Sequence, residues 1–572
     1  MRARLLIVPF ILTALLSARP HAQRGATAIT ESDLKTWLTY LASDELQGRR
    51  TYTEGLGLAA GYIASHLQQW GVKPAGDDGT YLQVVKVQGV KVNSKASITV
   101  DVNGQTRTFK DGEGVAFSRQ MGGKQTINGD QIVFAGYGLQ IPDAKIDDYA
   151  EIDPKGKVVI YLGQQGPSNI PAGSNRLLGA RGRNAVEKGA VAVLTLTNPA
   201  FAGRGQAATP PPTAPAGGRG GGRGGAAIET DFTTVQRYDN IITPQVSLQD
   251  EALEFLFSGS DVKFAELKEL AAKREPLRPF ALKGAKITIN VDADYQVVRT
   301  QRTNNVVGII EGSDPKLKDT YVAFGAHYDH VGYGEGAAPT GGQANPGGCT
   351  GQTRPQPRPG DTINNGADDD GSGTVALMAL AKAFATGQRP KRSLLFVWHA
   401  GEESGLLGSR FNADYPVVPL DKIVAQLNID MIGRNACDDP GKANHVYVVG
   451  SDRISTELHN LNEDANASLS KPMTLDYELN DPADPQSIYT RSDHYSYASK
   501  GIPIIFYFTG LHKDYHFVTD EVSKIEFPKL ARVTQLVHAT AQRVANLDHA
   551  PARDNKGPRA GKGFAGKLPG GK

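Results

Sequence analysis

Residues 321–330 read YVAFGAHYDH, and residues 394–403 read LLFVWHAGEE. Each stretch is an apolar run that passes directly into histidine or glutamate. The segments at 424–430 (VAQLNID) and 502–508 (IPIIFYF) have the same apolar character. Apolar runs without polar alternation are typical of strands buried on both faces of a parallel sheet, and a helix is expected between them at 374–384. Residues 286–548 are therefore predicted to form an α/β domain, with a mostly parallel mixed sheet and helices on both faces.

Acidic residues and histidines gather where these predicted strands end. A charged side chain is costly inside a core, but it is useful at the edge of a parallel sheet, where ligands bind. Two histidines and several carboxylates, with no cysteine among them, form a nitrogen and oxygen ligand set suited to zinc, manganese or cobalt. The residues concerned are His327, Asp430, Glu402 and Glu403 after strands, Asp368, Asp369 and Asp370 in GADDDGSG (366–373), and His516 in DYHFVTD (514–520).

Taken in this order, the motifs resemble those of the co-catalytic zinc aminopeptidase family, which also includes glutamate carboxypeptidases and glutaminyl cyclases. The resemblance extends to LASDELQGR at 41–49, NNVVGIIEGSDP at 304–315 and GEESGLLGS at 401–409. It implies a zinc-exopeptidase-like fold and two zinc ions per chain.

The resemblance also implies which residues hold the metals. Asp369 would bridge the two ions. His327 and Asp430 would complete one site, and Glu403 and His516 the other. A pair of dications bridged by one carboxylate suits the hydrolysis of a peptide bond, because the pair can stabilise both the attacking and the leaving group.

Three further roles follow from the same resemblance. Glu402 would be the general base, and Asp329 would orient the imidazole of His327. Tyr515 would donate a hydrogen bond to the developing oxyanion, although a neighbouring aromatic ring can also serve only for packing. Ser492 and Asp493 would lie in the wall of the substrate pocket; the alternative for Asp493 is a helix cap.

The sequence departs from the family pattern after the acid pair, where the usual asparagine is Asp370. This extra carboxylate either stabilises the metal site or faces solvent, and we favour the second interpretation. A Gly- and Pro-rich insertion at 334–361 follows His327 and is expected to shape the entrance for substrate. A disulfide between Cys349 and Cys437 would tie this insertion over the site; two unpaired thiols are the alternative.

The first half of the chain is expected to contain a second unit. Residues 23–115 are assigned to the catalytic domain, and residues 116–285 to an inserted β-rich module. The segments FAGYG (134–138), DPKGKVVIY (153–161) and EKGAVAVL (187–194) resemble a protease-associated domain. Within this module, residues 201–227 hold nine Gly, four Pro and three Arg, so we expect a mobile loop that is dispensable for catalysis.

The two ends of the chain carry their own signals. The basic MRAR and the apolar LLIVPFILTALLS (5–17) predict a signal peptide over residues 1–22, and hence a secreted or periplasmic protein; an uncleaved anchor is the alternative. Because the apolar run is shorter than a bilayer requires, we expect no stable membrane span in the mature chain. Residues 549–572 read as a disordered basic tail.

Composition excludes several classes of function. The chain has 572 residues, 40% of them hydrophobic, and its 62 basic residues nearly balance 60 acidic ones. A protein with so little net charge has no global field for nucleic acid, so none is expected as a partner. The prediction is a secreted zinc exopeptidase acting on peptides, most simply an aminopeptidase, because 502–508 offers no cation for a terminal carboxylate. A carboxypeptidase, a glutaminyl cyclase-like acyltransferase and a non-catalytic binding module are the alternatives; the oligomeric state is left open.

Overall fold

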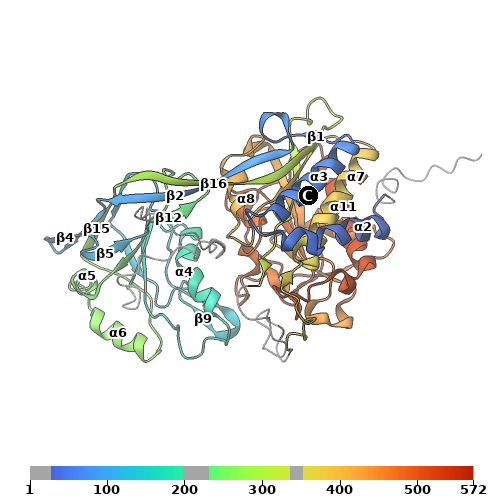
Figure 1. Cartoon of the computed structure of the whole chain (residues 1–572). Coiled ribbons are helices and arrows are strands. Elements are labelled where there is room, and N and C mark those ends of the chain that lie inside the picture. Colours follow the sequence, from blue (N-terminus) through green and yellow to red (C-terminus); the bar gives the residue numbers. More distant parts are fainter. Residues whose placement is uncertain (1–27, 197–230, 335–348, 350–351, 571–572) are drawn as a thin grey trace, which may run out of the picture.

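The computed structural model describes residues 28–196, 231–334, 349 and 352–570. The predicted signal peptide, the 201–227 segment and most of the 334–361 insertion lie outside these residues. Figure 1 shows two lobes, and each of them is built around a ten-stranded sheet. None of the described helices is long and apolar enough to cross a bilayer.

The first sheet has parallel central strands in the larger lobe, and its β12 end reaches the core of the smaller lobe (Figure 1). β17 lies between β20 and β21, β24 pairs with β21, and all four run in the same direction. In sheet order the strands are β12 (Phe232–Thr234), β2 (Leu82–Ser94), β16 (Ala293–Ile310), β20 (Ser393–His399), β17 (Tyr321–His327), β21 (Ile423–Ile429), β24 (Ile504–Phe508), β22 (His445–Val449) and β23 (Thr474–Asp476), with β1 (Lys73–Pro74) pairing with β16.

Helices cover both faces of this sheet, so the predicted α/β class is confirmed. Alternate residues of β17 point to opposite faces: Phe324 joins one apolar core and Ala323 the other. The first core is covered by α2 (Glu31–Leu41), α3 (Glu54–Gln69), α7 (Gly373–Thr386), α9 (Thr456–Ala467) and α11 (Phe527–Asn546). The other face carries α8 (Leu407–Asp414) and α10 (His494–Ala498).

The smaller lobe contains the second sheet and an apolar core of its own. Its strands, in sheet order, are β14 (Phe280–Ala281), β7 (Ile132–Phe134), β10 (Val158–Tyr161), β11 (Ala192–Leu196), β13 (Gln245–Leu248), β5 (Gly114–Phe117), β4 (Gln105–Asp111), β3 (Ser97–Val102), β15 (Ala285–Val291) and β6 (Gln125–Gly129). Its helices are α4 (Asn175–Glu187), α5 (Asp250–Leu256) and α6 (Phe264–Ala272).

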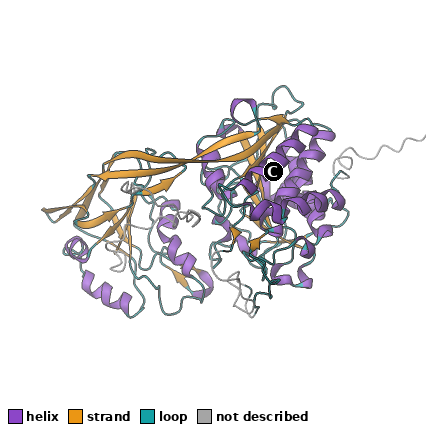
Figure 2. Ribbon diagram, viewed as in Figure 1, coloured by secondary structure: helices purple, strands orange, loops and turns teal. Residues whose placement is uncertain are grey.

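A two-stranded ribbon joins the lobes. β2 and β16 pair antiparallel from Leu82 with Val306 to Ser94 with Ala293, and they run between the lobes in Figure 2. The second sheet then begins at Ser97, upstream of the residue 116 at which we expected the inserted module, because β3 pairs with β15 across a long stretch of sequence.

The C-terminal segment differs from the predicted disordered tail. Its backbone packs along α9 and the preceding turn: Leu568 and Asn460 exchange two hydrogen bonds of 2.9 Å, and the N–H groups of Arg559 and Ala560 donate to Asp452. Ala560 and Leu568 are buried. The segment makes these contacts mainly through its backbone groups, so no hydrophobic periodicity in its sequence predicts them.

Candidate metal centre

The predicted ligands meet at one edge of the first sheet. His327 is the last residue of β17, Asp430 follows β21, and Glu403 follows β20 by four residues. Asp369 lies in the turn before α7, and His516 in the loop after β24. The four central strands are parallel, so their carboxyl ends bring these side chains together.

The side chains form two groups that share Asp369. Nε2 of His327 lies 3.3 Å from Oδ1 of Asp369 and 3.6 Å from Oδ2 of Asp430. Nε2 of His516 lies 3.0 Å from Oδ2 of Asp369 and 2.9 Å from Oε2 of Glu403. Each oxygen of Asp369 therefore faces a different histidine, as a bridging carboxylate must.

The donor atoms themselves fit a metal. Nε2 of His327, Nε2 of His516, Oδ2 of Asp369 and Oε1 of Glu403 are buried, and within the described part of the chain they make no hydrogen bond of ordinary geometry. Buried polar atoms are almost always satisfied, so a converging set of unsatisfied ones calls for a ligand. Imidazole nitrogen and carboxylate oxygen are donors that zinc accepts.

The adjacent glutamates Glu402 and Glu403 have opposite electrostatic environments. Burial raises the pKa of Glu402 well above its ordinary value, and the charges of Glu403 and Asp430 add to the rise, while His327 opposes it. Burial and Asp369 would also raise the pKa of Glu403, but His516 and His330 outweigh them and bring it to about 2. Glu402 therefore has the affinity for protons that a base needs, whereas Glu403 is held as an anion.

Asp329 connects His327 to Glu402. Nδ1 of His327 lies 3.1 Å from the Asp329 carbonyl oxygen and 3.7 Å from its carboxylate, and the Glu402 N–H donates to Oδ1 of Asp329 at 3.0 Å. The Thr51 hydroxyl donates to the other carboxylate oxygen at 3.3 Å. Burial raises the pKa of Asp329 to about 6, against the opposing charge of His327.

A small pocket opens beside the two groups, and its wall includes Glu402, Tyr515 and Ser492. The ring of Tyr515 stacks on His516 with the ring centroids 3.9 Å apart, and its hydroxyl accepts a hydrogen bond from Arg491 at 3.2 Å. Ser492 donates to Oδ2 of Asp430 at 2.7 Å.

Asp493 is placed differently from Ser492. It is fully buried beside His399, whose Nδ1 lies 3.3 Å from its carboxylate, and it does not line the pocket. Its side chain makes no capping hydrogen bond to α10 either. Asp493 thus holds the imidazole of His399 behind the site.

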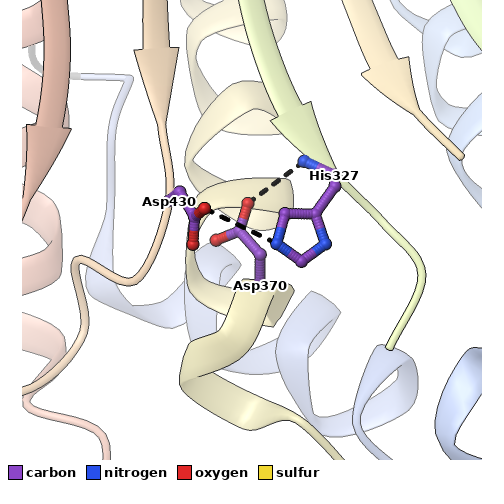
Figure 3. Close-up of side chains that lie close together, drawn as sticks. All are labelled: His327, Asp370 and Asp430. Carbon is purple, nitrogen blue, oxygen red and sulfur yellow. Dashed lines mark hydrogen bonds and ion pairs between the residues drawn. The ribbon is translucent and has the colours of Figure 1, made fainter. Parts of the chain in front are cut away.

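Asp370 does not face solvent, so our preferred interpretation of this carboxylate was wrong. It is fully buried, and it accepts hydrogen bonds from the N–H groups of His327 at 3.2 Å, Gly373 at 2.9 Å and Met431 at 3.1 Å. Figure 3 shows its carboxylate between His327 and Asp430. These N–H groups belong to three different segments, so Asp370 fixes the turn that presents Asp369.

Two functional residues were not predicted. Nδ1 of His330 lies 2.8 Å from Oε1 of Glu403, and His330, Asp369 and Glu403 form a group able to hold a metal. The buried guanidinium of Arg49 donates to the carbonyls of Tyr328, Asn365 and Gly366, which flank His327 and Asp369. His330 is the last residue of YVAFGAHYDH (321–330) and Arg49 the last residue of LASDELQGR (41–49), so their position in these motifs was the available signal.

The insertion reaches the site through a disulfide. Cys349 is bonded to Cys437, and Gln352 donates a hydrogen bond to the Cys437 carbonyl at 2.6 Å. The Cys349 sulfur also lies 3.4 Å from the carbonyl oxygen of Leu511, a residue of the pocket wall. The described part of the insertion is therefore fixed beside the pocket.

Comparison with known proteins identifies the domain that carries this site. Residues 305–541 match peptidase family M28. The match covers 237 of the 572 residues. The chain is 28% identical over 230 residues to leucine aminopeptidase 2 from Arthroderma otae, covering 36% of this chain and 44% of the relative. Aminopeptidase Y from Saccharomyces cerevisiae is 28% identical over 294 residues, which is 48% of this chain and 45% of the relative. The chain thus spans less than half the length of these curated relatives.

Solved structures were compared as well. An aminopeptidase from Aneurinibacillus aligns with a TM-score of 0.42 and 16% identity, covering 96% of this chain and all of the other. A zinc aminopeptidase from Bacillus subtilis aligns with a TM-score of 0.41 and 17% identity, covering 92% of this chain and 98% of the other.

Proposed function

We propose that the protein is a zinc-dependent aminopeptidase that removes N-terminal residues from peptides, with two zinc ions held by His327, Asp369, Asp430, Glu403 and His516. The observation that carries this proposal is the division of the cluster, in which each oxygen of Asp369 faces a different histidine. The names of the M28 relatives, leucine aminopeptidase 2 and aminopeptidase Y, support the choice of reaction. Bound there, the zinc ions would supply Lewis acidity and lower the pKa of water.

The chain's own residues would move the proton and hold the reacting groups. Glu402 lines the pocket with a raised pKa, so it is suited to take a proton from the attacking water and to deliver it to the departing amine. Tyr515 would donate its hydroxyl hydrogen to the developing oxyanion, while Arg491 holds that hydroxyl in place. Asp329 would keep His327 oriented toward Asp369 and Asp430.

Two further assignments concern the smaller lobe and the compartment of the protein. We assign the smaller lobe to a protease-associated domain inserted in the peptidase, on the basis of its motifs and its own apolar core. We also infer export from the cytoplasm, because the signal-peptide pattern at 1–22 is accompanied by a disulfide, which persists in oxidising compartments.

A carboxypeptidase is the second candidate, and one observation favours it. Arg491 lines the pocket, so a cation is present beside the site even though β24 supplies none. A free carboxylate of a substrate would suit this guanidinium.

Metal analysis together with a blocked and unblocked substrate panel tests both functions. The purified full chain should bind two zinc ions, hydrolyse leucine p-nitroanilide and leave N-acetyl-leucine p-nitroanilide intact. Hydrolysis of an N-blocked dipeptide with a free carboxylate, without cleavage of leucine p-nitroanilide, would favour the carboxypeptidase. Full zinc occupancy with no hydrolysis of any of these compounds would contradict a peptidase.

A further inference from the structure

A second cavity, of about 440 Å³, lies between the two lobes. One side of its wall is formed by α4, and Figure 1 shows this helix on the side of the smaller lobe that faces the larger one. The other side consists of residues from 481–490 of the larger lobe, and Pro558 of the C-terminal segment adds to it. A cavity of this size at the junction of two domains is the usual setting for a small-molecule site.

Two basic side chains of the smaller lobe line this cavity without a carboxylate partner. Nη2 of Arg183 donates to the Thr490 hydroxyl at 3.3 Å, whereas its Nε is buried and makes no hydrogen bond with the described residues. Lys188 donates to the side-chain oxygen of Gln140 at 3.0 Å. Both partners are uncharged, so neither contact neutralises the cation.

The larger lobe contributes a third cation, Arg453. Its Nε and Nη2 donate to Asn480 at 3.2 and 2.6 Å, and the guanidinium carbon lies 3.6 Å from the centroid of the Tyr489 ring. Burial lowers the pKa of Arg453, so the charges around it do not compensate for the hydration that it has lost. Arg453 is therefore held in position by uncharged groups while its charge remains available.

The two carboxylates in the wall are engaged elsewhere. Glu187 accepts a hydrogen bond from the Tyr495 hydroxyl at 2.8 Å, and Asp481 accepts one from the Ala483 N–H at 2.8 Å. Arg183 and Glu187 are four positions apart on α4, a spacing that allows an ion pair, yet the described residues contain none between them. Three cations and two carboxylates leave the wall with one net positive charge.

The chemistry of the wall indicates the ligand. A carboxylate or phosphate accepts strong hydrogen bonds from guanidinium and ammonium groups, and it would satisfy the buried Nε of Arg183. The rest of the wall includes aromatic and apolar side chains, such as Tyr149, Leu177 and Pro482. These side chains suit an organic body attached to the anionic group better than they suit a bare inorganic ion.

One segment belongs to both this cavity and the pocket beside the metal centre. Ser487, Tyr489 and Thr490 line the cavity between the lobes. Ile488, Arg491 and Ser492, which alternate with them or follow them directly, line the pocket that contains Glu402. A ligand that contacts one side of residues 487–492 therefore restrains the residues that form the wall of the other pocket.

We propose that the cavity between the lobes is an effector site for a small organic anion, whose carboxylate or phosphate group is held by Arg183, Lys188 and Arg453. Its occupation orders residues 487–492 and thereby prepares the pocket beside the metal centre for substrate. The binding site itself is independent of the proposed peptidase function, and only its effect on turnover rests on that function.

Calorimetric titration of the full chain with phenylacetate, phenyl phosphate and phenylacetamide tests the site. At least one of the two anions should bind, and the more tightly bound one identifies the anionic group, whereas the neutral amide should not bind. Lys188→Gln and Arg183→Gln should each weaken anion binding about tenfold, the loss expected for one hydrogen bond to a charged group. Lys286→Gln, at an exposed position of β15, removes an equal charge from the smaller lobe and should keep the wild-type affinity.

The zinc centre can also attract anions, so the titrations are repeated after zinc has been removed with a chelator. Binding that persists without zinc and weakens in Lys188→Gln and Arg183→Gln supports the cavity. Binding that disappears with zinc and is unaffected by both substitutions belongs to the metal centre and would overturn the proposal. Equal binding of phenylacetamide, or no binding of either anion, would overturn it as well.

Hydrogen exchange measures the link between the two pockets without turnover. The bound anion should slow amide exchange at residues 487–492 and in α4. It should also lower the KM for leucine p-nitroanilide about fivefold, at the lower end of the coupling found between two sites. Unchanged exchange at 487–492, or an unchanged KM, would overturn the effector role. Slowed exchange in a protein that cleaves no peptide would contradict only the proposed peptidase function.

Discussion

The two ten-stranded sheets differ in what their strands support. In the first sheet, four parallel central strands carry helices on both faces, and charged side chains collect where those strands end. The second sheet has its own apolar core, yet among the described residues the groups able to hold a metal all lie in the first lobe. The second sheet also contains four parallel strands, β7, β10, β11 and β13. Neither a well-packed core nor a shared edge of parallel strand ends is therefore sufficient for chemistry; side chains able to bind a ligand must also lie at that edge.

A buried charged pair near the site differs from the exposed pairs of the smaller lobe. Near the site, Arg434 lies 2.7 Å from Asp514, and both side chains are almost completely buried. In the smaller lobe, the pairs Arg107 with Glu251 and Lys268 with Asp250 are largely exposed. Exposed pairs contribute little to stability, whereas buried charges impose one arrangement on their surroundings. The larger lobe is therefore the one in which single charges should have large effects.

The largest effect is expected at Glu402 and Glu403. Glu402→Gln keeps the volume of the side chain and removes the carboxylate that we propose as the base, so kcat should fall by about 10²–10⁴ while zinc stays bound. Glu403→Ala should instead lose zinc, with activity partly restored by excess metal. Zinc stoichiometry and steady-state kinetics on both variants test this. Glu251→Gln, in the smaller lobe, is the control and should turn over like the wild type.

The opposite results would change the roles assigned to Glu402 and Glu403. Loss of zinc in Glu402→Gln, with zinc retained in Glu403→Ala, would exchange the two assignments. Full activity in both variants would place the chemistry outside this edge of the first sheet, and the contrast between the lobes would fail.

A smaller effect is expected for Tyr515→Phe. The change removes the hydroxyl that we assign to the oxyanion and leaves the ring stacked on His516, so kcat should fall by about 10² with zinc content unchanged. Tyr295→Phe is the matched control, because its hydroxyl donates to the Gly122 carbonyl in the smaller lobe. A Tyr515→Phe protein with wild-type kcat would reduce Tyr515 to a packing residue.

The parts of the fold that the sequence predicted are those with local signals. The spacing of Leu34, Trp37, Leu38 and Leu41 is typical of an amphipathic helix, and the structure buries all four in α2. The apolar runs at 321–326 and 424–429 predicted parallel strands, since a strand covered on both faces has no polar positions. These features depend on residues within a few positions of each other.

The parts that escaped prediction depend on distant partners. The β2–β16 ribbon pairs residues about two hundred positions apart, so no local pattern marks the boundary of the module. Asp370 was assigned to solvent, yet it is engaged by the N–H groups of His327 and Met431, which lie on distant segments, and by that of Gly373 in the same turn. His330 and Arg49 likewise become functional only through contacts that the fold creates.

A pH-dependent difference in stability between the lobes is expected from His538. Burial lowers the pKa of this residue from 6.5 to about 4, and its ring stacks on Phe384. Between pH 6.5 and 4, His538 is protonated in the unfolded chain but stays neutral in the folded lobe. The free energy of unfolding of this lobe therefore falls by about 2 kcal/mol between pH 7 and pH 5. Tryptophan fluorescence during urea unfolding follows this lobe, because Trp37, Trp70 and Trp398 all belong to it. His538→Leu should remove this part of the pH dependence; an unchanged slope would show that His538 titrates normally.

The smallest effect, of opposite sign, is expected in the smaller lobe. Burial raises the pKa of Asp148 from 3.8 to about 6, although the N–H groups of Leu139 and Tyr137 partly stabilise its charge. As the pH falls below 6, Asp148 is protonated in the folded lobe, whereas in the unfolded chain it is protonated only near pH 3.8. This group therefore adds about 1 kcal/mol of stability as the pH falls from 7 to 5. Hydrogen exchange of β7 and β10, corrected for the intrinsic rate at each pH, measures the local stability. Asp148→Asn should remove the gain, because the amide stays neutral at both pH values. Equal pH slopes in wild type and variant would contradict the raised pKa, and the two lobes would then respond to acid in the same direction.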